Sequence, residues 1–349
     1  MSINKKIIPM PLRYIINAVL FGAFLYIMNH IISSGIISKY YSGVISLIGI
    51  YIILAVSLNV ATGYLGQLPL GHAGFMVIGA YTSAIIMKSV AAGSTGVAFP
   101  FALLAGGILA GVFGLIIGIP ALRLRGDYLA ILTLGFGEII RVILLNIDNV
   151  LGFTLTNGAA GLQKIPKTTT FLITFICVGI TIFAIHTLMK SRHGRAILSI
   201  RENEIAAEAC GINTTYYKTL GFVVSAFFAG IAGGLFAGYI GILSPSDFGF
   251  MKSIEILVMV VLGGMGSMIG SVLSATVLTA LPELLRSFER YRMVVYSLIL
   301  VIVMIFKPSG LFGTYDFSLN SLLDKLILLF KGKRKNGQKN NEIKEGAEK

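Results

Sequence analysis

A few ionisable side chains lie within long apolar stretches of this chain and could support ion pairing or transport. Glu138 and Arg141 occur in TLGFGEIIR, and Glu255 occurs in SIEILVMVVLGG after the polar stretch 244–247. A charge in hydrocarbon is costly, so such residues indicate a functional site or a structural ion pair. At spacing i, i+3 Glu138 and Arg141 share one helix face and can neutralise each other. Both interpretations stay open for them, and Glu255 is expected at the outer mouth.

A second group of polar side chains interrupts the apolar stretch NVATGYLGQLPLGHAGFMVIGAY, at the point where glycines are densest. Irregular backbone at membrane depth is tolerated where it is buried in protein or lines a cavity. Close packing of helices through small faces also explains many of the glycines. The stretch is therefore predicted either to border a translocation path or to form a tight turn. The candidate path residues are Asn59, Gly63, Gln67, His72, Gly74, Tyr81, Glu138 and Glu255.

The one substantial polar segment within the apolar part of the chain covers residues 190–218, and we call it the island. Asn203 can cap a short helix there, and Gly211 is predicted to end it with a positive φ. Its small residues let a partner groove approach closely, which favours a docking helix over an ordinary solvated loop. The residues assigned to contact with the partner are Arg201, Glu202, Glu204, Ala206, Ala207, Glu208 and Gly211.

The composition indicates which elements must hold these residues. The 349 residues are 56% hydrophobic and 12% charged, about half the charged fraction of a soluble domain. Apolar runs of about 20 residues without alternation predict spanning helices rather than barrel strands. The fold class is an all-α polytopic membrane protein with about ten transmembrane helices, and eight or nine are also compatible. The predicted spans are 14–34, 41–62, 70–90, 98–122, 128–148, 171–189, 219–241, 254–266, 268–286 and 293–306.

The net charge of +13 follows the membrane topology. With the N-terminus inside and ten spans, most of the Lys and Arg residues fall on the inner side, as the positive-inside rule requires. This predicts a cytoplasmic N-terminus over 1–13 and a permease domain over 14–313 that contains the cytoplasmic island. The tail over 314–349, amphipathic and then basic, is predicted to lie along the inner leaflet. No basic surface is interleaved with stacking aromatics, which disfavours nucleic-acid binding.

The sequence lacks the common signatures of an enzyme. No G-x-x-x-x-G-K-[ST] motif occurs, so a nucleotide site of the P-loop kind is excluded. The four histidines are scattered and form no metal constellation. No catalytic residue, metal or cofactor is predicted.

The island sequence SRHGRAILSIRENEIAAEACGIN resembles the cytoplasmic loop of LivM-type permease subunits in branched-chain amino acid ABC importers. Its core from Glu204 to Gly211 is similar to the coupling motif of bacterial ABC importers. Four further blocks agree in order, from Gly63 to Gly313: GYLGQLPLGHAGFMVIGAY, LRLRGDYLAILTLGFGEIIR, SIEILVMVVLGGMGSMIGS and RMVVYSLILVIVMIFKPSGLFG. Pro69 departs from the serine of the family pattern, and Ala159 and Ala160 stand where glycine is more usual.

The resemblance implies a type II-like importer permease in the bacterial inner membrane, working by alternating access. It implies two cytoplasmic ATP-binding subunits, a second homologous permease subunit as heterodimer partner, an extracytoplasmic substrate-binding protein and contact of this chain with membrane lipid. The implied cargo is leucine, isoleucine or valine, whereas related permeases carry urea, amides or other amino acids. The rival class is a self-contained secondary transporter or channel, whose ion-coupling site would have to come from Glu138, Arg141 and Glu255. A membrane scaffold without transport would leave the interrupted segment unexplained.

Overall fold

The computed structural model describes residues 10–90, 95–124, 126–151, 156–286, 291–307 and 310. The regular structure of these residues is helical, and no strand occurs among them. The chain divides into two compact units, one formed by residues 1–30 and 316–349 and the other by residues 31–315. In the first unit the structure describes the beginning of α1 (Met10–Ser33), where the rings of Tyr26 and His30 stack. The predicted amphipathic tail lies outside the described residues.

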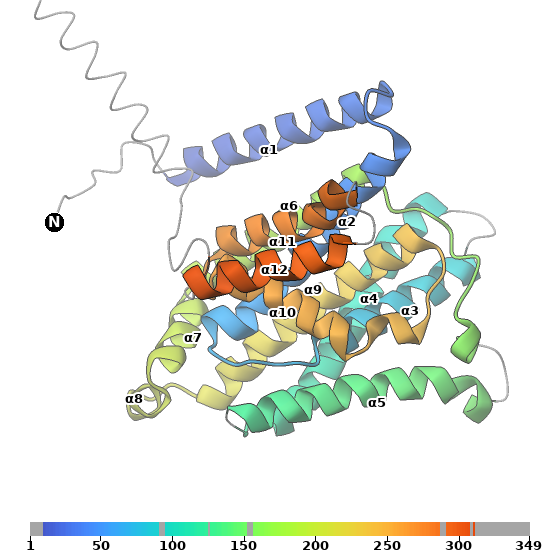
Figure 1. Ribbon diagram of the computed structural model, residues 1–349. Coiled ribbons are helices and arrows are strands. Elements are labelled where there is room, and N and C mark those ends of the chain that lie inside the picture. Colours follow the sequence, from blue (N-terminus) through green and yellow to red (C-terminus); the bar gives the residue numbers. More distant parts are fainter. Residues whose placement is uncertain are drawn as a thin grey trace, which may run out of the picture. The chain divides into compact units, whose positions relative to one another are not determined.

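The second unit contains the other helices that the structure describes (Figure 1). They are α2 (Lys39–Asn59), the π-helix η1 (Val60–Tyr64), α3 (His72–Val90), α4 (Thr95–Ala121), α5 (Asp127–Leu151), η2 (Gly158–Ala160), α6 (Phe171–Lys190), α7 (Arg192–Glu202), α8 (Glu204–Ala209), α9 (Thr214–Ile240), η3 (Pro245–Phe248), α10 (Phe250–Gly263), α11 (Met268–Leu284) and α12 (Arg292–Phe306).

Each predicted span falls on a helix, with boundaries that shift by a few residues. Six helical segments of the described chain are long and apolar enough to cross a membrane: Ile15–Ser33, Lys39–Tyr64, Ala98–Ala121, Asp127–Asp148, Phe171–Lys190 and Thr214–Ile240. The chain is therefore a multi-pass membrane protein. The total of about ten spans stays a prediction, because α10 and α11 have only 14 and 17 residues and a full crossing takes about 20.

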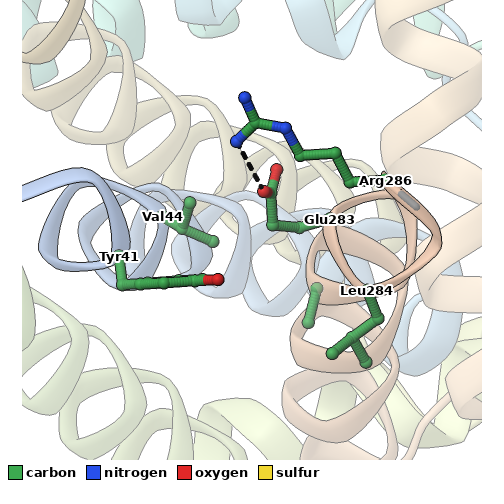
Figure 2. A pocket seen from close by; sticks show the side chains of 6 residues that line it. Tyr41, Val44, Glu283, Leu284 and Arg286 are labelled. Carbon is green, nitrogen blue, oxygen red and sulfur yellow. Dashed lines mark hydrogen bonds and ion pairs between the residues drawn. The ribbon is translucent and has the colours of Figure 1, made fainter. Parts of the chain in front are cut away.

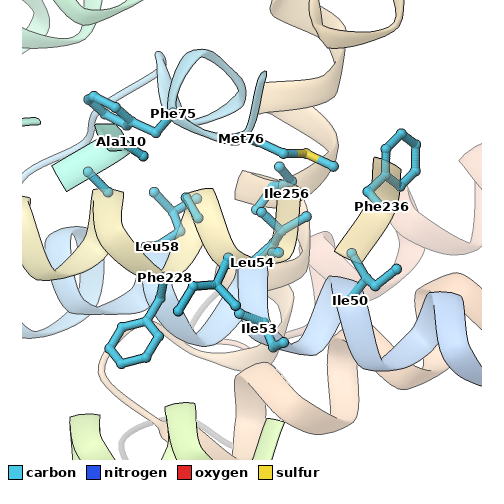
Figure 3. Packing of buried hydrophobic residues seen from close by; sticks show 14 of the residues in the cluster. Ile50, Ile53, Leu54, Leu58, Phe75, Met76, Ala110, Phe228, Phe236 and Ile256 are labelled. Carbon is cyan, nitrogen blue, oxygen red and sulfur yellow. The ribbon is translucent and has the colours of Figure 1, made fainter. Parts of the chain in front are cut away.

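Helices α3, α4 and α9 pack closely against one another, and small residues let their backbones approach. A Cβ atom at Gly79 of α3 would overlap the backbone of Gly230 in α9, and one at Gly233 would overlap the carbonyl of Met76. Packing through small faces is thus confirmed for these glycines. The apolar core around them includes Ile50, Ile53, Leu54, Leu58, Phe75, Met76, Ala110, Phe228, Phe236 and Ile256 (Figure 3).

The predicted interruption between α2 and α3 is confirmed. The backbone widens into the π-helix η1, where the Leu65 amide donates to Val60 O at 3.1 Å, and it is irregular from there to Gly71. Gly66 has a φ of +73°, a conformation that favours glycine. At the far end of this unwound segment, the Ala73 amide of α3 donates to Ser253 Oγ of α10 at 3.0 Å. The two ends of the unwound segment are buried at Leu65 and Gly71, whereas Gly66 and Leu68 in its middle are exposed.

A second interruption separates α10 from α11, at a run of glycines. Helix α10 ends at Gly263, and Gly264 and Gly266 have φ values of +102° and +89°. Ser267 then caps α11, its hydroxyl accepting from the Gly270 amide at 3.1 Å. The two short helices thus form a hairpin that turns at residues 264–267.

Candidate coupling surface and translocation path

The island folds into two successive helices, α7 and α8. Ser191 caps α7, accepting a hydrogen bond from the Gly194 amide at 3.3 Å. Helix α7 buries Gly194, Ile197 and Ile200 along one face. Sequence analysis predicted the second helix but not α7, although this spacing of three residues is the periodicity of an amphipathic helix.

Helix α8 has the two ends that the sequence predicts. Asn203 Oδ1 accepts from the Ala206 amide at 3.1 Å, which satisfies one of the free N–H groups of the first turn. At the other end Gly211 has a φ of +80°. Its amide donates to Glu208 O at 2.9 Å, and the Ile212 amide donates to Ala207 O at 3.0 Å. This pair of bonds is the Schellman motif, so α8 is held at both ends.

Three residues assigned to partner contact make contacts within the chain, although Glu208 stays exposed. Glu204 Oε1 lies 2.6 Å from the ammonium of Lys218, whose side chain is only 4% exposed. Glu208 Oε1 accepts from the Thr214 hydroxyl at 2.6 Å, and Ala207 is buried. Sequence analysis assigned Ala207 to partner contact because small residues let a groove approach. In the structure a bulky residue at this position would overfill the chain's own interior, so the partner contact of these three residues stays a prediction.

The surface that α8 presents is small and mostly apolar, and Glu208 is its exposed charged residue. Ile205 is 71% exposed, and Ala206, Ala209 and Cys210 are exposed beside it. Ile205 was missed by sequence analysis. Ile205 lies two residues before the buried Ala207, which places the two side chains on roughly opposite faces of the helix. Sequence analysis had placed Ala207 at the partner surface and so had no signal for Ile205. A protruding isoleucine among alanines on a doubly capped helix is suited to insertion into an apolar groove.

The two helix interruptions contact each other through Asn59, which is buried. Asn59 Nδ2 donates to Ser267 O at 3.1 Å, and its Oδ1 accepts from the Gly266 amide at 2.9 Å. Gly63 packs so tightly against this turn that a Cβ atom would overlap Gly266 N. Two of the predicted path residues, Asn59 and Gly63, therefore join the interruption after α2 to the interruption after α10.

The remaining polar residues of the first interruption differ in their surroundings. His72 is buried, and its Nε2 lies 3.1 Å from the Ser57 hydroxyl. Gly74 packs against Gly137 of α5. Gln67 Oε1 is buried and accepts no hydrogen bond from the part of the chain that the structure describes. A buried acceptor without a partner costs about 1–3 kcal/mol. The side-chain oxygen of Gln67 is therefore the candidate of this segment for accepting a hydrogen bond from a ligand.

The predicted ion pair of α5 is confirmed. Glu138 Oε2 lies 2.7 Å from Arg141 Nε, and the two side chains are 33% and 27% exposed. The other carboxylate oxygen accepts from the Phe250 amide at 3.1 Å. Glu138 therefore ties α5 to the first turn of α10, and it borders a small cavity together with Gly71 and Ser253.

Glu255 is also paired, with a lysine that sequence analysis did not single out. Lys252 Nζ lies 3.0 Å from Glu255 Oε2 and contacts the Tyr51 hydroxyl. It also lies over the rings of Tyr51 and Phe236, 4.7 Å and 5.7 Å from their centroids. The spacing i, i+3 on one helix was the available signal for this pair. Tyr81, another predicted path residue, is buried and donates to Leu243 O at 3.2 Å.

A larger cavity of about 400 Å³ lies between the first turns of α2 and the end of α11 (Figure 2). Its walls include Glu283 and Arg286, whose Oε1 and Nη1 atoms are 3.4 Å apart. The Tyr40 hydroxyl donates to the other oxygen of Glu283 at 2.5 Å. None of the candidate path residues lines this cavity.

Apolar helices with two interruptions and one ordered polar island describe a multi-pass membrane protein of the kind that permeases are. Comparison with known proteins agrees. Residues 40–305 match the family described as "Branched-chain amino acid transport system / permease component", and the chain belongs to this family. No solved structure matches.

Three curated relatives illustrate the range of the family. The chain is 38% identical to the high-affinity branched-chain amino acid transport system permease protein LivM of Escherichia coli K12, over 75% of this chain and 67% of the relative. It is 26% identical to LivH of the same strain, over 75% of this chain and 91% of LivH. It is 28% identical to the nucleoside ABC transporter permease protein NupC of Lactococcus lactis, over 60% of this chain and 70% of NupC. The resemblance to a LivM-type permease is therefore confirmed.

Proposed function

We propose that this chain is the LivM-type permease subunit of an ABC importer that carries leucine, isoleucine and valine across the bacterial inner membrane. The observation behind this proposal is the structure of helix α8. The helix is capped at both ends, is joined to α9 by the ion pair of Glu204 with Lys218, and exposes Ile205. Such a helix can transmit force, because a rigid element moves as a unit when a partner displaces it. The named relatives give the cargo class.

The proposed complex contains two cytoplasmic ATP-binding subunits, and ATP hydrolysis belongs to them. A second, homologous permease subunit completes the membrane part, and an extracytoplasmic binding protein delivers the substrate. In this topology the N-terminus, the island and the C-terminal tail face the cytoplasm, which agrees with the positive-inside distribution of Lys and Arg. ATP-driven closure of the ATP-binding subunits moves α8, and the bundle then alternates between outward and inward access.

The translocation path is proposed to follow the unwound segment between α2 and α3. Irregular backbone inside a membrane protein is typical of helices that line a substrate route. Gln67 supplies an unpaired carbonyl there, whereas the His72 ring contacts the Ser57 hydroxyl. Glu138 and Glu255 neutralise neighbouring cations, which leaves this region suited to a zwitterionic cargo without net charge.

Gln67→Leu is expected to lower substrate uptake about two- to tenfold, which corresponds to the loss of one neutral hydrogen bond. If Gln67 had only a packing role, removal of an unpaired acceptor would be neutral or stabilising. Thr279→Val is the matched control, because Thr279 Oγ1 is also buried without a partner among the described residues but lies in α11. Uptake and recovery of the intact complex are measured for both variants. Unchanged uptake by Gln67→Leu would return the segment to packing alone.

The alternative cargo is a different small polar molecule, such as urea, an amide, another amino acid or a nucleoside. The similarity to a permease named for nucleoside transport favours keeping this second candidate. ATP-dependent uptake by the purified complex, with leucine and uridine compared as cargo, tests the proposed function and separates the two candidates.

A further inference from the structure

A single arginine joins the island to both helix interruptions. Arg201 is the penultimate residue of α7, and its Nη1 donates to Gly63 O at 2.7 Å. The stem of the side chain lies along the unwound segment, where a Cβ atom at Gly66 would meet Arg201 Cγ at 3.2 Å. The guanidinium also lies beside the second interruption, since a Cβ atom at Gly266 would meet Nη1 at 2.9 Å.

The backbone around Arg201 leaves room for this contact because the nearby positions are glycines. Gly66 and Gly266 both have positive φ, and neither carries a side chain that would displace the arginine. The acceptor, Gly63 O, is a backbone carbonyl in the π-helix η1, where the wider winding disturbs the regular ladder of intrahelical bonds. A guanidinium donor to such a carbonyl makes a charge-assisted hydrogen bond, which is roughly twice as strong as a neutral one.

Asn59 extends the connection to the hairpin. Through Asn59 the first interruption is bonded to Gly266 N and Ser267 O, and through Arg201 it is bonded to α7. Helix α7 is followed directly by Asn203, the cap of α8. An unbroken series of contacts therefore runs from α8 through α7 and Arg201 to η1, and from there through Asn59 to the turn between α10 and α11.

We propose that Arg201, although exposed on the island, is a positioning residue that transmits displacement of the island to the two helix interruptions, and that binding of the ATP-binding subunits does not require it. This inference rests on the proposed function, because it assigns a route to coupling that α8 begins. When α8 is displaced, Arg201 moves with α7, and the Gly63 carbonyl and the hairpin turn move with it. Without the guanidinium, the partner still binds α8 but its movement no longer reaches the interior of the bundle.

The test compares Arg201→Met with Arg201→Lys in the intact complex. Methionine keeps an unbranched apolar stem against Gly66 and removes the donor, whereas lysine keeps a charged donor. We expect Arg201→Met to retain the ATP-binding subunits and their ATP hydrolysis but to move roughly tenfold less substrate per ATP, the equivalent of about 1.4 kcal/mol. Arg201→Lys should recover part of this ratio. Arg192→Met is the matched control, since Arg192 is exposed at the other end of the same helix, and its ratio should be normal.

Three results would overturn the proposal: a normal ratio in Arg201→Met, loss of the ATP-binding subunits from that variant, or the same fall in Arg192→Met. If Arg201→Met does not reach the membrane, Arg201→Leu, which also lacks the donor, decides the question by the same ratio, and a normal complex with no loss of coupling overturns the proposal. Failure of the proposed function is recognised separately. In that case no ATP-binding subunit co-purifies with the unaltered chain.

Discussion

Ile205→Asp is expected to detach the ATP-binding subunits while the permease itself inserts and folds normally. Ile205 is 71% exposed at the surface of α8, so aspartate there disturbs no internal packing. In an apolar partner groove, however, the carboxylate would be buried without a counter-ion, which costs several kcal/mol. We expect recovery of the ATP-binding subunits with the purified permease to fall about tenfold or more, and ATP-driven uptake to fall with it.

Ile242→Asp provides the matched control for this surface. Ile242 is 53% exposed and follows Gly241 at the end of α9 that is remote from the island. The change in charge and volume is the same, but it lies outside the proposed coupling surface. Full recovery of the ATP-binding subunits with Ile205→Asp would contradict the assignment of α8 as the coupling helix. Equal losses in both variants would indicate an effect of charge alone.

Gly79→Ala is expected to destabilise the bundle severely despite adding only one methyl group. The new Cβ atom would overlap the backbone of Gly230, and backbone cannot move aside as a flexible side chain can. Helices α3 and α9 must then separate, and overpacking of this kind costs about 1–3 kcal/mol. We expect less folded protein in the membrane and a lower midpoint of thermal unfolding in detergent.

Gly135→Ala tests whether the effect comes from the contact or from loss of a helical glycine. Gly135 lies in α5, and a Cβ atom there would meet nothing within 4 Å. Alanine is favoured over glycine in a helix by up to about 1 kcal/mol, so this variant should unfold at the same or a slightly higher temperature. A Gly79→Ala protein as stable as Gly135→Ala would show that α3 and α9 do not pack as described.

Hydropathy and local propensity were sufficient to predict the long apolar helices, the interruption near Gln67 and both ends of α8, but not α7. These features depend on residues close together in sequence, such as Asn203 with Ala206 and Gly211 with Ala207. The direction of the island side chains could not be predicted in the same way. Glu204 faces α9 because Lys218, fourteen residues further on, is buried there, and only the tertiary fold brings the two together.

The contacts of the path residues were beyond prediction for the same reason. Asn59 bonds to a turn more than 200 residues away, and Arg201 reaches Gly63 across 138 residues. Periodicity carries no information about such pairs. The resemblance to a permease family supplied the coupling role of the island and the cargo class, but it did not indicate that Arg201 donates to the carbonyl of Gly63.

The most direct test of the central claim is transport by the complex purified through this chain, reconstituted in vesicles with ATP available to the ATP-binding subunits. The loaded binding protein is supplied on the opposite face, and accumulation of labelled leucine is measured with and without ATP. We predict that leucine accumulates only with ATP, that isoleucine and valine compete for it and that uridine does not. Leucine accumulation driven by a sodium or proton gradient without ATP, or a complex that contains no ATP-binding subunit, would contradict the account.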